Sequence, residues 1–290
     1  MVERQRTFSR ESTFEGPGLF SGEVSKLTFA PAAPNTGITF VREQDGKVAT
    51  IPASVKNVMK RPRRTCLKNG TLFVETVEHC MAALAGMGVD NAIVKVSGGH
   101  VGELPAFDGS SKPFVDALRD AGIKEQSADL EPLIITKPVQ VAHGDATLAA
   151  LPGPKDTLEI IYEFEAAPPI GRQTLSFRLG DDDFIDQLAP ARTFVFEHEA
   201  QALRDRGLGK HLSPKDLLVI SPSGPIDNQF RYADECVRHK ALDLIGDLAL
   251  AGCDLDGHFI AHRSGHRLNA ELVRALLNEE EIIESRRRSA

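Results

Sequence analysis

The sequence predicts an α+β fold made of two domains with similar topology. A chain of 290 residues with 41% hydrophobic content is at the size where a single core stops growing, so we expect two cores of roughly 130 to 150 residues each. Within each half, short β-type runs precede helical spacing. We therefore expect a structural duplication with domains at 1–127 and 128–290. This expectation rests on element order, because no residue-level repeat accompanies it.

The first half alternates predicted strands with predicted helices. Short β-type runs predict strands at 26–30 and 37–41, which Pro, Gly and Asn turns separate. Helical spacing covers 77–84, another strand follows at 91–96, and a proline in the first turn opens a short helix over 113–120.

A linker is predicted at 122–131, because this segment is charged and lacks an apolar period. The order of elements then starts again. Strands are predicted at 133–136, 146–151 and 158–162, and helices at about 197–206, 233–251 and 269–278.

Composition excludes several classes of function. The net charge of −7 and the pI of about 5.8 argue against nucleic acid as a partner, since only local clusters such as Lys60–Arg64 are basic. The four cysteines form no CxxC pair, which favours a reducing compartment. The N-terminus lacks an apolar segment, and no run of about 20 apolar residues could span a bilayer. We expect a monomeric, cytoplasmic protein without a transmembrane segment.

The most informative segment is the helix expected from Asp234 to the residue before Gly252. Apolar side chains gather on one face, whereas His239, Asp243 and Asp247 follow one another at i, i+4 spacing on the other. A His and an Asp one turn apart can bind one divalent ion, because their Cβ atoms lie about 5 to 6 Å apart. Spacing alone nevertheless favours a solvated polar face with an ion pair.

Cys236 leaves a second alternative open on this helix. A thiolate is a good zinc donor, and the Cys-x-x-His spacing to His239 suits a ligand pair. A small buried hydrophobe is the role that we expect for this cysteine.

His79 is a third candidate ligand. It lies in the segment Glu75–Gly86, which predicts a helix with Thr76 as the N-cap and with Glu78 and His79 in the first turn. The helix dipole favours a carboxylate at an N-terminus in any protein, which gives Glu78 a purely structural alternative. A catalytic zinc, however, needs three protein ligands, an open water position and a nearby carboxylate that takes the proton of the water.

His266 lies in the run Arg263-Ser-Gly-His-Arg-Leu-Asn269, which predicts a loop leading into a terminal helix that Asn269 caps. A histidine on such a loop is often only a surface residue. Without further context, that is the expectation for His266.

These segments match one protein family in order and spacing. The matching segments are Thr76–His79, Glu103–Ser110, Ala191–Phe194, Asp234–Leu248 and Ser264–His266. They resemble the UDP-3-O-acyl-N-acetylglucosamine deacetylases, metal-dependent enzymes that commit their substrate to lipid A synthesis in Gram-negative bacteria. The resemblance covers nearly the whole chain, and the block His-Lys-x-x-Asp-x-x-Gly-Asp-Leu is its most specific part.

The resemblance implies a fold in which each domain is a sheet-plus-helices sandwich, with helices packed between the two sheets and the active site at their junction. It also implies that His79, His239 and Asp243 bind Zn²⁺, with Fe²⁺ as another metal that such a set could hold. Glu78 would be the general base that activates the attacking water.

The resemblance implies roles for four further residues. His266 would protonate the leaving amine, Asp247 would orient His266, and the Thr193 hydroxyl would help stabilise the tetrahedral oxyanion. Lys240, next to a ligand on the polar side of its helix, would belong to both the catalytic and the substrate-binding residues.

The implied substrate is UDP-3-O-[(3R)-3-hydroxyacyl]-N-acetylglucosamine, whose 2-acetamido group would be hydrolysed to the free amine and acetate. Lys240 and Arg263 resemble positions that receive the diphosphate. Phe194 and Phe164 resemble aromatic positions that line the sugar and nucleotide site.

Three departures from the family pattern fall where the acyl-chain passage is built. Phe20 stands in place of the usual histidine, Val195 in place of a common glycine, and His211-Leu212-Ser213 in place of Gly-Gly-Ser. We therefore keep a second hypothesis, a paralogous deacetylase that acts on another nucleotide sugar. A third, a metal-free binding protein, predicts erosion of the metal set, yet every member is present.

Overall fold

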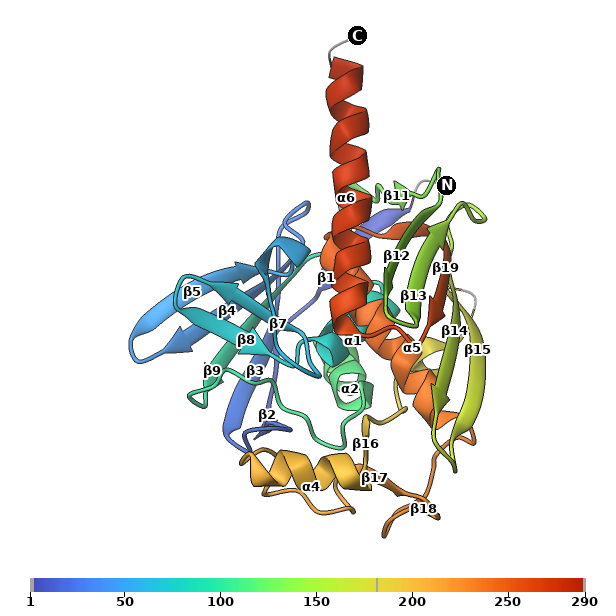
Figure 1. The fold of residues 1–290 in the computed structure, drawn as a ribbon. Helices are drawn as coiled ribbons and strands as arrows, with labels where there is room; N and C mark the ends of the chain where they lie inside the picture. Colours follow the sequence, from blue (N-terminus) through green and yellow to red (C-terminus); the bar gives the residue numbers. More distant parts are fainter. Residues whose placement is uncertain (1–2, 181, 289–290) are drawn as a thin grey trace.

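Two β-sheets form the outer layers of the fold, and helices lie between them (Figure 1). The computed structural model describes residues 3–180 and 182–288, with the backbone alone for 279–288. The first sheet has the order β2-β3-β9-β4-β5. Its strands are β2 (Ser12–Pro17), β3 (Val24–Pro31), β4 (Ile38–Gln44), β5 (Lys47–Pro52) and β9 (Ala92–Gly98).

The second sheet repeats this strand order as β12-β13-β19-β14-β15, and the short β11 (Leu133–Ile134) also pairs with β19. In each sheet the central pair is parallel, β4 with β9 and β14 with β19, and the other pairs on the path are antiparallel. The strands are β12 (Val139–His143), β13 (Ala146–Leu151), β14 (Leu158–Ala166), β15 (Gly171–Leu179) and β19 (Leu255–His262).

Each half also places its two main helices at corresponding points of the chain. In the first half α1 (Glu78–Gly86) precedes the central strand and α2 (Lys112–Ala121) follows it. In the second half α5 (Glu235–Leu248) and α6 (His266–Arg288) take these places. The predicted α+β class and the shared topology are thus confirmed, whereas the division at residues 127 and 128 stays a prediction.

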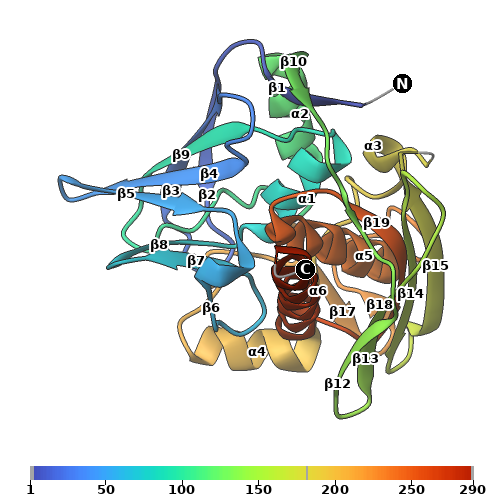
Figure 2. The same ribbon diagram turned by 90° about the horizontal axis from the view of Figure 1, so that it is seen from above.

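An insert separates the fourth strand of each sheet from the next long helix. The first insert holds η1 (Val55–Asn57), β6 (Val58–Met59), β7 (Cys66–Asn69) and β8 (Leu72–Glu75). The second holds α3 (Phe184–Gln187), β16 (Phe194–Phe196), α4 (Glu197–Asp205), β17 (Leu218–Ser221) and β18 (Gly224–Pro225). The view from above places α4 near β6, below the central helices (Figure 2). An ion pair between Arg63 and Glu199 joins the two inserts, with Nη2 and Oε1 2.5 Å apart.

The linker predicted at 122–131 is wrong, because this segment forms β10 (Ile123–Asp129), which pairs antiparallel with β1 (Arg4–Phe8). Pairing of two strands uses backbone groups and needs no apolar alternation. Most side chains of β10 are at least partly exposed, so a charged sequence is tolerated there.

The terminal helix is longer than the predicted 269–278. It begins at His266, directly after Gly265, and continues to Arg288. The residues beyond 278 include several glutamates and arginines, which are good helix formers. Among the described residues, no helix combines the length and the apolar character that crossing a membrane requires.

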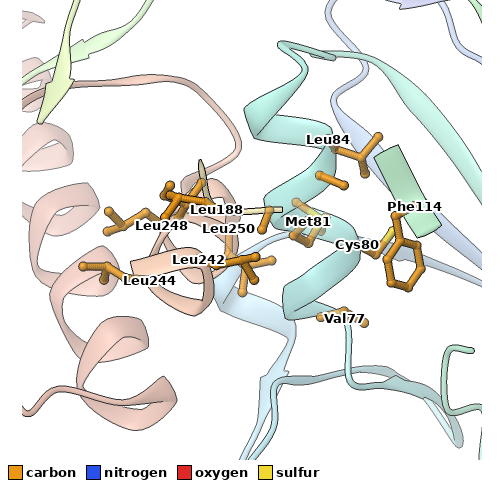
Figure 3. Close-up of a cluster of buried hydrophobic side chains, with 14 of the residues drawn as sticks. Val77, Cys80, Met81, Leu84, Phe114, Leu188, Leu242, Leu244, Leu248 and Leu250 are labelled. Atoms are coloured by element: carbon orange, nitrogen blue, oxygen red, sulfur yellow. The ribbon is translucent and has the colours of Figure 1, made fainter. Parts of the chain in front are cut away.

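The core is continuous from one half to the other, because α1 packs directly against α5. Side chains of both helices, among them Met81 and Leu242, fill the space between them (Figure 3). Both are essentially inaccessible to solvent. The two halves therefore bury their helices against each other rather than against water.

The backbones of α1 and α5 approach each other closely at Gly246. A Cβ built on this glycine would lie 2.1 Å from the backbone oxygen of Glu78 and 3.1 Å from the amide nitrogen of Ala82. Only a residue without a side chain fits, so sequence and packing together fix the helix crossing that brings α1 to the polar residues of α5.

We expect Gly246→Ala to destabilise the protein by about 1–3 kcal/mol, although alanine is the better helix former. The added methyl group would force the two backbones apart. Urea denaturation measures the free energy of unfolding. The control is Gly265→Ala, where an added Cβ meets nothing within 4 Å. A Gly246→Ala protein as stable as the control would contradict this account of the crossing.

Candidate active site

Three side chains that could hold a metal ion meet where α1 crosses α5. His79 comes from the first turn of α1, and His239 and Asp243 lie one turn apart on α5. One ligand atom from each lies within 4.8 Å of the others. All three are buried, with at most 3% of each residue exposed. The solvated polar face that spacing alone favours is therefore wrong, because α1 covers that face of the helix.

The donor atoms of this cluster fit a divalent metal. Asp243 Oδ1 lies 3.5 Å from His79 Nε2 and 3.3 Å from His239 Nε2. Among the described residues this buried oxygen accepts no hydrogen bond, an arrangement that is costly unless a cation compensates it. Two imidazoles and one carboxylate are ligands that Zn²⁺ and similar ions prefer.

The protonation states of the cluster also suit ligation. His239 Nδ1 lies 3.1 Å from the carbonyl oxygen of Ala191, which leaves Nε2 as the free donor atom. Burial lowers the pKa of His239 to about 3, so the ring is neutral. Burial opposes ionisation of Asp243, but its neighbours, among them the charged ammonium of Lys240, outweigh it and hold the pKa of this carboxyl well below its usual range.

Glu78 lies beside the cluster at the first position of α1 and is 2% exposed. Its Oε2 accepts a hydrogen bond of 3.0 Å from the amide of Thr65. Its Oε1 lies 3.8 Å from His266 Nε2. Burial raises the pKa of Glu78, which makes its carboxylate a stronger base than an exposed one.

His266 belongs to a buried hydrogen-bond network rather than to the surface, and only 16% of its side chain is exposed. Its Nδ1 lies 2.8 Å from Asp247 Oδ2, and Asn269 Nδ2 donates to the same oxygen over 2.8 Å. The surface role expected for an isolated histidine is therefore wrong.

The charge of His266 follows from its neighbours. Burial lowers the pKa of this imidazole, but Asp247 and Glu78 raise it more, so that the pKa is about 9. Because Nδ1 faces Asp247, the proton on Nε2 is the one directed toward Glu78. The site thus holds a protonated acid next to a buried base.

The two capping assignments made from the sequence are wrong. Thr76 is not the N-cap of α1: Val77 takes that place, and the Thr76 hydroxyl donates to Glu103 Oε1 over 3.2 Å. Asn269 lies inside α6, and its side chain donates to Asp247. Both polar side chains serve contacts between elements distant in the chain.

Lys240 lies on α5 next to His239, and its ammonium donates to Asp243 Oδ2 over 2.7 Å. Burial disfavours the charged form, but Asp243 and Tyr162 outweigh this and raise the pKa of Lys240. The ammonium is therefore charged where it borders the cavity. Cys236, by contrast, packs in an apolar cluster, and burial raises the pKa of its thiol to about 12. It is a buried hydrophobe, not a ligand.

A cavity of about 860 Å³ opens onto the cluster. Its walls include Glu78, His266 and Lys240, and also the two predicted contact residues Thr193 and Arg263. The site is therefore accessible to a molecule considerably larger than acetate.

Aromatic rings form one wall of this cavity. Phe164 and Phe194 have ring centroids 5.5 Å apart in an edge-to-face arrangement, and Phe194 lies 6.3 Å from the ring of His239. The segment that carries Thr193 and Phe194 is anchored by the buried pair Arg192–Glu235, with Nε and Oε1 2.8 Å apart. A further hydrogen bond of 2.8 Å joins the Thr193 amide to the carbonyl oxygen of Gly109.

The departures from the family pattern also lie at the cavity. Phe20 lines it beneath the guanidinium of Arg64, whose carbon is 4.3 Å from the ring centroid. Val195 and Leu212 are wall residues as well. The amide of Gly209 donates to the carbonyl oxygen of Phe20 over 2.9 Å, and a Cβ built on Gly22 would lie 2.6 Å from His211 Nδ1, so the loop after α4 packs on the loop that carries Phe20.

Sequence reasoning missed Thr65, which contacts Glu78, Asp247 and His266. It follows the basic run at 60–64, where nothing in the pattern indicates a role. Asn269 could have been found, since it lies three residues after His266 and shares its helix face.

Comparisons with known proteins agree with the geometry. Residues 5–278 match the family model described as LpxC, UDP-3-O-acyl N-acetylglycosamine deacetylase. A protein of Myxococcus xanthus (strain DK1622) is 38% identical over 98% of this chain and 90% of its own length. A protein of Thermosynechococcus vestitus (strain NIES-2133 / IAM M-273 / BP-1) is 38% identical over 95% of this chain and 94% of its own length. Both are named UDP-3-O-acyl-N-acetylglucosamine deacetylase. The resemblance drawn from the motifs is confirmed.

Proposed function

The chain belongs to the UDP-3-O-acyl-N-acetylglucosamine deacetylase family, and we propose that it hydrolyses the 2-acetamido group of UDP-3-O-[(3R)-3-hydroxyacyl]-N-acetylglucosamine. The products are the free amine and acetate, and the reaction serves lipid A biosynthesis. The observation that carries the proposal is the meeting of His79, His239 and Asp243 beside a buried base and a protonated acid.

The metal in this proposal is Zn²⁺, with Fe²⁺ as the alternative that the same donors accept. His79 Nε2, His239 Nε2 and Asp243 Oδ1 would hold it. When bound, such an ion polarises the acetamide carbonyl and lowers the pKa of the attacking water.

Glu78 acts as the general base. Its carboxylate takes one proton from the water, whose oxygen forms a bond to the acetyl carbon. The Thr193 hydroxyl, in the wall of the same cavity, donates a hydrogen bond to the oxyanion of the tetrahedral intermediate.

His266 acts as the general acid. The imidazolium transfers its Nε2 proton to the amide nitrogen as the carbon–nitrogen bond breaks, which allows the amine to leave. Asp247 holds Nδ1 and so keeps Nε2 directed at the reacting group. Glu78 Oε1 lies 3.8 Å from His266 Nε2, which is too far for a direct hydrogen bond, so the proton taken from water returns to His266 through an intervening water molecule after each turnover.

The remaining wall residues recognise the substrate. Lys240 and Arg263 supply positive charge for the diphosphate, and Phe164 and Phe194 provide apolar surface for the sugar and nucleotide. Apolar residues of the second insert, including Leu203 and Leu212, receive the acyl chain. Cys66, Cys80 and Cys236 carry buried free thiols, which supports a cytoplasmic location for the reaction.

Acetate release from the acylated UDP-sugar and from UDP-N-acetylglucosamine tests the proposal. We expect kcat/KM to be at least about 100-fold higher for the acylated compound, because its chain buries apolar surface that the other lacks. Equal turnover of the two would overturn the proposal in favour of a paralogue that acts on another nucleotide sugar.

A further inference from the structure

Thr65 lies between the two groups that move protons in the proposed reaction. It is the residue before β7 and is 3% exposed. Its amide donates to Glu78 Oε2 over 3.0 Å, and its hydroxyl donates to Asp247 Oδ1 over 2.5 Å. The hydroxyl oxygen also lies 3.3 Å from His266 Nδ1. One residue of the first insert thus reaches the base on α1 and the acid at the start of α6.

The direction of these hydrogen bonds follows from the groups involved. A carboxylate has no proton to give, so the single hydroxyl proton of Thr65 points at Asp247. The Nδ1 proton of His266 faces Asp247 Oδ2, the nearer acceptor at 2.8 Å. With Asn269 as a third donor, both oxygens of Asp247 are occupied and its plane is fixed.

We propose that Thr65 is a positioning residue for both proton-transfer groups: its hydroxyl fixes Asp247 and thereby His266, and its amide fixes Glu78. The catalytic role of Thr65 rests on the proposed function. Its hydrogen bonds to Glu78 and Asp247 do not depend on which nucleotide sugar is the substrate.

The backbone and the side chain of Thr65 have separable tasks. Its carbonyl oxygen accepts a hydrogen bond of 3.3 Å from the amide of Val77, directly before α1. The preceding residue, Arg64, forms a buried ion pair of 2.7 Å with Glu75. These contacts hold the chain in place without the hydroxyl. A valine at position 65 would therefore keep the shape and the amide contact to Glu78 while removing the donor to Asp247.

Replacing Thr65 by valine should shift the pKa of His266 in one direction. The charged groups facing the imidazole are Asp247 and Asp243 on α5 and Glu78 on α1. Without the Thr65 proton, the charge of Asp247 is less compensated and attracts the imidazolium more strongly. The pKa of His266 then rises, and His266 becomes a weaker acid that is also less firmly oriented.

The test compares Thr65→Val, Thr65→Ser and the unmodified, metal-loaded protein. For Thr65→Val we expect kcat to fall about 10- to 100-fold with KM and metal content nearly unchanged. The alkaline limb of the kcat profile should move up by about 0.5 pH unit or more. Thr65→Ser restores the hydroxyl and should behave like the unmodified protein.

A second readout does not require the substrate. The titration of His266, followed by NMR of histidine-labelled protein and assigned with His266→Gln, should shift upward in Thr65→Val only. The control is Thr7→Val, which removes another buried hydroxyl, one that donates to the carbonyl oxygen of Asn91 over 2.6 Å. It should change stability without changing the titration.

Three outcomes would overturn the positioning role: an unshifted His266 titration in Thr65→Val, a normal kcat in that variant, or equal impairment of Thr65→Ser and Thr65→Val. Failure of the proposed function would look different. The unmodified protein would then release no acetate from the acylated UDP-sugar, while the His266 titration would still respond to Thr65→Val.

Discussion

Glu78→Gln is expected to lower kcat by about 10²- to 10⁴-fold while leaving the metal content unchanged, because a general base contributes about this much and an amide cannot take the proton of the water. Glutamine has nearly the same size, and its side-chain oxygen can still accept the hydrogen bond from the Thr65 amide. Saturation kinetics on the acylated UDP-sugar and elemental analysis of the metal give the two measurements. Glu78→Ala should lose a similar share of the rate.

The matched control is Glu197→Gln, which removes an exposed carboxylate from the first turn of α4 and should leave kcat unchanged. A nearly normal kcat in Glu78→Gln would refute the assignment of the base. Loss of the metal in that variant would also refute it, since Glu78 would then act through the ligand set rather than on the water.

The helix that carries the site could be predicted from its sequence, but its environment could not. Periodicity predicted the helix and the i, i+4 spacing of His239, Asp243 and Asp247. It favoured a solvated face for these residues, because it contains no information about a second helix. The structure buries all three, since Gly246 allows α1 to cover that face.

Local sequence patterns also could not predict which residues distant in the chain meet at the site. His79 and His239 come from different halves, and only the family resemblance linked them before the fold was known. Thr65 carried no sequence signal at all, because its contacts to α5 and α6 arise only when the first insert folds over the helix crossing.

Capping rules failed at Thr76 and Asn269 for a common reason. Both residue types are favoured at helix starts because their short polar side chains can accept from backbone amides. Here the same side chains donate to buried carboxylates, Glu103 and Asp247. A buried carboxylate needs its donors more than a helix end needs its cap, since hydrogen bonds to charged groups are worth about twice as much.

His79→Ala is expected to abolish stoichiometric metal binding and, with it, activity. Two ligands on one turn of α5 remain, whereas a catalytic zinc site uses three protein ligands. The unmodified protein should hold about one ion per chain, lose activity with a chelator, and regain it with Zn²⁺ or Fe²⁺. The control is His258→Ala, which removes a partly exposed histidine of β19 that pairs with Glu159 outside the cavity.

A thermal readout separates loss of the metal from loss of chemistry. An ion that binds only the folded state raises Tm, and the rise grows with the logarithm of the free ion concentration over its Kd. Zn²⁺ should therefore raise the Tm of the chelated protein and of Glu78→Gln, but not that of His79→Ala. Asp243 Oδ1 explains why the ion should stabilise the folded state. This buried oxygen accepts no hydrogen bond within the described part of the chain, and a bound cation would compensate its charge. An equal rise in Tm for His79→Ala would mean that the ion binds elsewhere, and the ligand set would have to be abandoned.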